Sequence, residues 1–156
     1  MSSQITNIYD RLAAITIPYD GVNPTVYSLG TVPNSIESAM LPARLLIPMS
    51  NRQREDFAFI AVGTGARVVW TIQDVLLVRA AGQSRGPLDA LRPLVAYTGA
   101  YADAMRSWRE PGQASAGTRT TLDRVSVDVV TYEWPSGAGL WYWGALATLT
   151  ISEYLT

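Results

Sequence analysis

The pentapeptide Gly82–Gly86 has the spacing in this chain that most resembles a catalytic motif. Its sequence, Gly-Gln-Ser-Arg-Gly, fits G-x-S-x-G and lies between strand-like and helix-like segments, the context of a nucleophile elbow. A serine nucleophile needs a base, usually His or Lys. The chain has no His, and its 12 basic residues are all Arg. We therefore interpret Ser84 as a loop residue and expect no catalytic serine.

Carboxylates are the remaining side chains that could act as acids or bases, because Cys is absent too. A pair of Asp or Glu can catalyse hydrolysis where burial raises the pKa of one of them. Only Asp74 interrupts a buried-looking segment, and its expected role is a structural pair with an Arg. A carboxylate-based hydrolase stays open as an alternative, and a small-ligand binding module as another. The carboxylates concerned are Glu37, Asp74, Asp128 and Glu133.

Metal and cofactor motifs are weak in this sequence. Gly63-Thr-Gly65 lacks a third glycine and precedes a strand, whereas a dinucleotide phosphate needs a helix N-terminus. No loop has the carboxylate spacing of a calcium site. We expect no metal, no cofactor and no catalytic residue.

Length and composition indicate one folded domain over residues 1–156. Apolar residues make up 48% and charged residues 16%, with a net charge of −1. The arginines form no basic stripe, so specific binding of duplex DNA is not predicted. An uncharged run, Trp134–Ser152, has the length of a membrane span, but its Pro and Gly residues and its alternation of Thr with Leu and Ile favour a strand. We expect no membrane segment.

Periodicity predicts an α+β fold. The N-terminal helix carries Ile5, Ile8, Leu12 and Ile15 on one face, with Ser2 or Ser3 as its cap, and ends before Pro18. A long amphipathic helix ends near Trp108 and either kinks or begins at Pro93. Together these helices flank a mostly antiparallel sheet of about four to six strands. The predicted strands are 25–29, 43–47, 57–62, 67–78, 125–129 and 140–154.

Two segments are candidate contact surfaces. One is the polar stretch Ser50–Asp56, which contributes Arg52, Arg54, Glu55 and Asp56. The other is the turn between the last two strands, where aromatic side chains exceed what a two-stranded tip can bury. These are Trp134, Trp141, Tyr142 and Trp143. Either they pack on the N-terminal helix of the same chain, or they anchor a subunit interface.

The order of these elements resembles the tail terminator proteins of long-tailed bacteriophages. The resemblance rests on the N-terminal helix, the Pro-bounded segment Leu41–Pro48, a hairpin into Trp70, a long helix and a final hairpin. It is best in Ala138–Glu153, where an aromatic stretch leads into alternating Leu, Thr and Ile and a final acidic residue. It covers most of the chain and includes no catalytic motif.

The resemblance implies a structural role in the virion. It implies a hexameric ring that caps the tail tube, ends tube polymerisation and joins the tail to the head-side connector, with duplex DNA passing through the lumen without specific binding. The expected location is the tail or neck of the virion, after assembly in the host cytoplasm. The alternative within the same class is a tail-tube or head-completion ring subunit.

Overall fold

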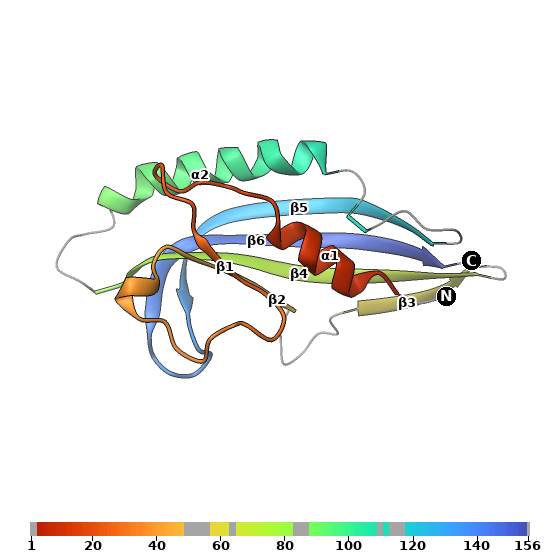
Figure 1. Cartoon of the computed structure of the whole chain (residues 1–156), viewed down its shortest axis with the longest axis horizontal. Coiled ribbons are helices and arrows are strands. Elements are labelled where there is room, and N and C mark those ends of the chain that lie inside the picture. The colour runs from red at the N-terminus through yellow and green to blue at the C-terminus, as the bar shows by residue number, and fades with distance from the viewer. Residues whose placement is uncertain are drawn as a thin grey trace.

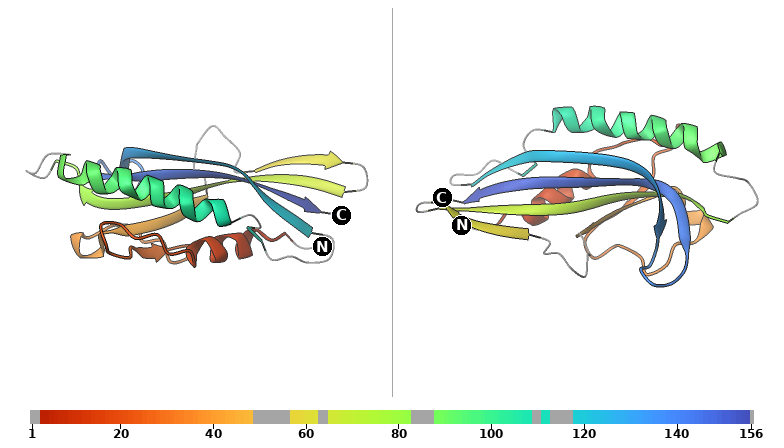
Figure 2. Two further views of the ribbon diagram at one scale, coloured as in Figure 1. Left: turned by 90° about the horizontal axis from the view of Figure 1, so that it is seen from above. Right: turned by 180° about the vertical axis from the view of Figure 1, so that it is seen from behind.

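The fold is a six-stranded sheet with two helices on one side of it (Figures 1 and 2). The computed structural model describes residues 3–48, 57–62, 65–82, 88–108, 111–112 and 118–155. In chain order the elements are α1 (Ile5–Ala13), β1 (Thr25–Tyr27), the short 3-10 helix η1 (Ser38–Met40), β2 (Ala43–Pro48), β3 (Phe57–Val62), β4 (Gly65–Ala80), α2 (Leu88–Ser107), β5 (Thr118–Glu133) and β6 (Trp141–Leu155).

The strand order is β1-β2-β4-β6-β5, and β3 pairs with β4. The β1–β2 pair is parallel and the other described pairs are antiparallel. The predicted α+β class with a mostly antiparallel sheet is therefore confirmed. Strand β5 is longer than the predicted 125–129, because polar residues extend it to both sides of that apolar run, whereas β6 lies within one residue of its predicted bounds.

Strand β4 is the centre of the molecule. Its side chains alternate between two apolar clusters, one containing Ile72 and Leu76 and the other containing Val75 and Leu77. All four are fully buried. Both faces of this strand are covered in its second half, by the helices on one face and by residues of the segment 27–41 on the other.

One edge of β4 is shared by two strands that follow each other in the chain. Strand β2 pairs with β4 from Ala43 opposite Leu77 to Pro48 opposite Ile72. Strand β3 resumes on the same edge, with Phe57 opposite Trp70. On β4 the two pairings are separated by a single position, Thr71.

The long helix α2 begins at Leu88 and continues through Pro93. The possibility that it begins at Pro93 is thus excluded. The N-cap of α1 is Gln4, not the predicted Ser2 or Ser3, and its side chain makes no capping bond. The Ser3 hydroxyl nevertheless accepts a hydrogen bond from the Ile5 amide at 3.2 Å. None of the described helices is long and apolar enough to cross a membrane.

Candidate assembly interface and buried polar cluster

The aromatic hairpin between β5 and β6 has a fixed tip. The Glu133 carboxylate accepts bonds from the amides of Gly137 at 2.5 Å and Gly139 at 3.2 Å, and both glycines have positive φ. Only glycine adopts that conformation readily, so the turn depends on these residues. The tip therefore presents its side chains from a well-defined backbone.

Two of the predicted aromatic anchors point into their own subunit. The Trp134 indole N–H donates to the Pro33 carbonyl at 3.0 Å, and the Tyr142 hydroxyl donates to the Ile36 carbonyl at 3.1 Å. Tyr142 is 6% exposed. One of the two predictions was that these rings pack on the N-terminal helix. Trp134 and Tyr142 instead bond to the irregular segment around Pro33 and Ile36.

The outward-facing part of the hairpin is apolar. Trp143 is half-buried against the larger core cluster, but Trp141 is 48% exposed and its neighbour Leu140 is 51% exposed. Two adjacent large apolar side chains on a rigid turn are the kind of anchor that interfaces use. Of the four aromatic candidates, Trp141 is the most exposed, and Leu140, which was not a candidate, is exposed beside it. The charged candidates Arg52, Arg54, Glu55 and Asp56 lie outside the described residues, as does Ser84.

Asp74 lies at the centre of a buried polar cluster under the helices. Its carboxylate accepts bonds from Arg44 Nε and Nη2 at 2.6–3.0 Å and from the Tyr101 hydroxyl at 2.7 Å. Arg44 is 1% exposed and Asp74 is 2% exposed. The expected pair of Asp74 with an Arg is present, so this carboxylate serves as a structural acceptor.

Buried charges of the sheet meet both ends of α1. At its C-terminal end, Arg44 donates to the carbonyls of Leu12 at 3.2 Å and Ile15 at 2.6 Å. At its N-terminal end, the fully buried Glu153 accepts from the Gln4 amide and from the Ser3 hydroxyl. A cation at the last carbonyls and an anion at the first amides both complement the helix dipole. Sequence reasoning gave Glu153 and Arg44 no such role, because the partners are about 150 and 30 residues away.

Tyr97 and Tyr101 offer a matched test of the cluster. Both are buried, but only Tyr101 donates to Asp74; the Tyr97 hydroxyl has no hydrogen-bond partner among the described residues. Tyr101→Phe is expected to lower the free energy of unfolding by ~1–3 kcal/mol, because a buried carboxylate loses a donor. Tyr97→Phe is expected to leave it unchanged or raise it, since it removes an unsatisfied hydroxyl. Urea unfolding followed by circular dichroism measures both, and equal losses would contradict this account.

The same tyrosines predict alkaline sensitivity. Burial, reinforced by the charge of Asp74, raises the pKa of both Tyr97 and Tyr101 above the ordinary 10.0. The unfolded chain therefore releases these protons first, so stability is retained below about pH 10 and falls as the pH rises above it. Each group contributes a slope of up to about 1.4 kcal/mol per pH unit. Unfolding titrations from about pH 9 upward should show a shallower decline for Tyr97→Phe than for the unchanged chain; identical declines would refute the assignment.

The other candidate carboxylates do not join Asp74. Glu37 caps η1, Glu133 holds the hairpin turn, and Asp128 is exposed on β5. Asp123, which was not a candidate, accepts from Ser152 and pairs with Arg67 at 3.4 Å. No group of three or more acidic residues that could hold a metal occurs in the described part of the chain.

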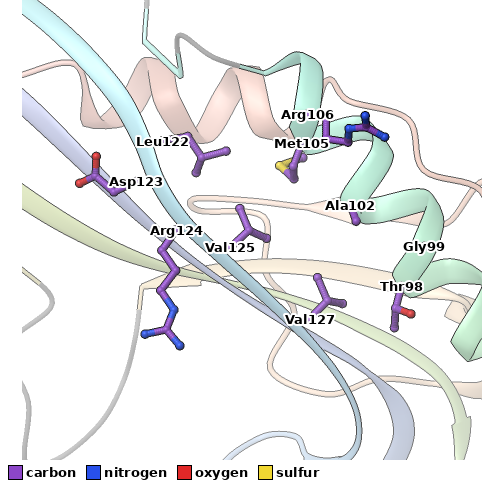
Figure 3. Close-up of a pocket in the computed structure, with 10 residues that line it drawn as sticks. All are labelled: Thr98, Gly99, Ala102, Met105, Arg106, Leu122, Asp123, Arg124, Val125 and Val127. Carbon is purple, nitrogen blue, oxygen red and sulfur yellow. The ribbon is translucent and has the colours of Figure 1, made fainter.

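A groove lies between α2 and β5 at the described surface. It has a volume of about 560 Å³. Gly99, Ala102 and Met105 line it from the helix, and Leu122, Val125 and Val127 line it from the strand (Figure 3). Its walls are mostly apolar, with Arg106 and Arg124 nearby. Such a groove beside a sheet edge can accept another chain segment.

Comparison with models of known protein families and with curated protein sequences gives no match to this chain.

Proposed function

We propose that this protein is a structural virion subunit of the tail-terminator type. In this proposal, copies form a ring, hexameric by the resemblance, on the last ring of the tail tube. The ring stops tube polymerisation and receives the head-side connector, and duplex DNA passes through its lumen. The protein then resides in the tail or neck of the virion and needs no cofactor.

The observation that carries this proposal is the exposed pair Leu140 and Trp141 beside a turn whose amides donate to Glu133. Burying such a pair against a neighbour removes apolar area from water at little cost in chain entropy, because the backbone is already ordered. The absence of His, Lys and Cys from the sequence supports a binding role over catalysis. The use of Asp74 and Glu133 as structural acceptors supports it further.

Trp141→Ala tests the proposal. We expect the affinity for tube ends to fall by at least about 30-fold, the effect of losing an interface hot spot of about 2 kcal/mol. The free chain should also lose about 1–2 kcal/mol of stability, because half of the side chain is buried, so circular dichroism must show that the variant is folded in the assay. The measurement counts capped ends of purified tail tubes in negative-stain images as the concentration of the protein is varied.

Val22→Ala is the matched control, because Val22 is also an exposed apolar residue, at 53%, but lies far from the hairpin in the sequence. It should cap tubes like the unchanged protein. A chain that never binds tube ends would refute the proposal, and equal capping by both variants would refute the role of Trp141. Long stacks of rings in place of single caps would instead identify a tube subunit.

A further inference from the structure

Strand β5 is the last strand on its side of the sheet, and α2 runs alongside it (Figure 1). It ends the strand order, and β6 is its one strand partner among the described residues. Its central part carries Arg124, Ser126 and Asp128 on one face and Val125 and Val127 on the other, where the two valines line the groove under α2 (Figure 3). An open edge of this length with apolar side chains invites pairing with another strand.

The charges on this edge are complementary to themselves. When β5 is laid antiparallel to a second β5 with Ser126 opposite Ser126, Arg124 lies opposite Asp128 in both directions. Val125 then lies opposite Val127 in both directions. Centring the pair on Arg124 or on Asp128 would place like charges opposite each other, which is destabilising. Among registers centred on residues 124 to 128, only the one centred on Ser126 places Arg124 opposite Asp128.

Arg124 and Asp128 have no ion-pair partner in the part of the chain that the structure describes. Residues four apart on one strand are separated by about 13 Å, too far to pair with each other. Asp123, by contrast, is already paired with Arg67, and the irregular register between Leu122 and Arg124 ends the regular edge there. The unpaired charges thus lie in the regular part of the edge.

The groove offers room for the apolar face of an added strand. Gly99 and Ala102, which line the groove from α2, have no side chain or only a methyl group. A Cβ added at Gly99 would meet no atom within 4 Å. The volume of about 560 Å³ extends along Leu122, Val125 and Val127. Valines from a second β5 would complete an apolar layer that one subunit leaves unfilled.

We infer that a second copy of this chain docks on β5, antiparallel and related by a two-fold axis through Ser126. This contact closes on itself, so it differs from the head-to-tail contacts that build a ring. It therefore goes beyond the proposed function and does not depend on it. The dimer joins the two sheets into one continuous sheet. Arg124 of each copy then forms an ion pair with Asp128 of the other.

The absence of cysteine from the chain allows a direct test. Residues directly opposite in an antiparallel pair have Cα atoms about 4.5–5.5 Å apart, within the range that a disulfide spans. Ser126→Cys should therefore form a disulfide-linked dimer under mild oxidation. Asp128→Cys is the matched control on the same strand, because its own copy lies several residues away. It should cross-link at least about tenfold more slowly, but should link readily to Arg124→Cys in a mixture.

Charge exchange tests the register without cysteine. Arg124→Asp and Asp128→Arg should each raise the dissociation constant of the dimer by at least about tenfold, because each places like charges opposite one another twice. The double variant should restore it. Sedimentation equilibrium measures the constants, and circular dichroism checks folding. A monomer at all concentrations, or equal cross-linking of Ser126→Cys and Asp128→Cys, would overturn the inference. Trp141→Ala should leave the dimer intact, which separates this result from the ring proposal.

Discussion

We expect Arg44→Met to lower the free energy of unfolding by ~3–5 kcal/mol. The substitution removes every bond that Arg44 makes to Asp74, Leu12 and Ile15 and leaves a carboxylate buried without its cation. Domains of this kind are stable by about 5–15 kcal/mol, so a large part of the total would be lost. Urea unfolding followed by tryptophan fluorescence measures the change.

Arg106→Met is the control for lost charge alone. Arg106 pairs with Asp103 at 3.5 Å, but its side chain is 82% exposed, so its removal should cost less than about 0.5 kcal/mol. The double variant Arg44→Met/Asp74→Leu should be more stable than Arg44→Met, because the uncompensated charge is gone. If Arg44→Met and Arg106→Met lowered the free energy of unfolding by similar amounts, the buried Arg44–Asp74 pair would contribute no more to stability than the exposed pair.

We expect Gly144→Ala to destabilise the sheet by at least ~3 kcal/mol. A Cβ at this position would lie 1.8 Å from the Leu76 carbonyl oxygen, a backbone atom that can move only if β4 and β6 separate. The close approach occurs where the β4–β6 register shifts, between the pairs Leu77–Gly144 and Arg79–Trp143. Thermal and urea unfolding of the variant provide the measurement.

Gly99→Ala is the matched control, because Gly99 lies inside α2 with open space around it. Alanine is the better helix former, so this variant should gain about 0.5–1 kcal/mol. If both glycine variants changed stability by the same amount and in the same direction, the argument from the approach of Leu76 would be wrong.

The sequence was sufficient for the main elements and for the role of Asp74. Apolar runs and helical spacing are local signals, and they predicted both helices and the central strand at the positions observed. A carboxylate in a buried strand needs a cation, so an Arg partner could be predicted for Asp74. Its identity could not, because the choice of Arg44 follows from the pairing of β2 with β4 across about 30 residues.

The segment 28–42 shows where periodicity fails. It has no regular pattern, yet its carbonyls at Pro33 and Ile36 accept the bonds of Trp134 and Tyr142. These contacts depend on backbone atoms that are present in every residue, so no residue type marks them in advance. The excess of aromatic residues indicated that the hairpin needs a neighbour, but it could not indicate which part of the chain provides one. Of the four aromatic residues of the hairpin, Trp141 is the most exposed.

The interruption between β2 and β3 gives the molecule a place to accept foreign sequence. Each strand pairs with β4 on its own, so we expect an insertion between Pro48 and Phe57 to leave both pairings in place. Doubling the length of a flexible connection costs only about 0.6 kcal/mol in closure entropy. A peptide tag or small domain grafted there would be displayed from an unaltered scaffold, and natural variants of such a chain could diverge in recognition while keeping the same sheet.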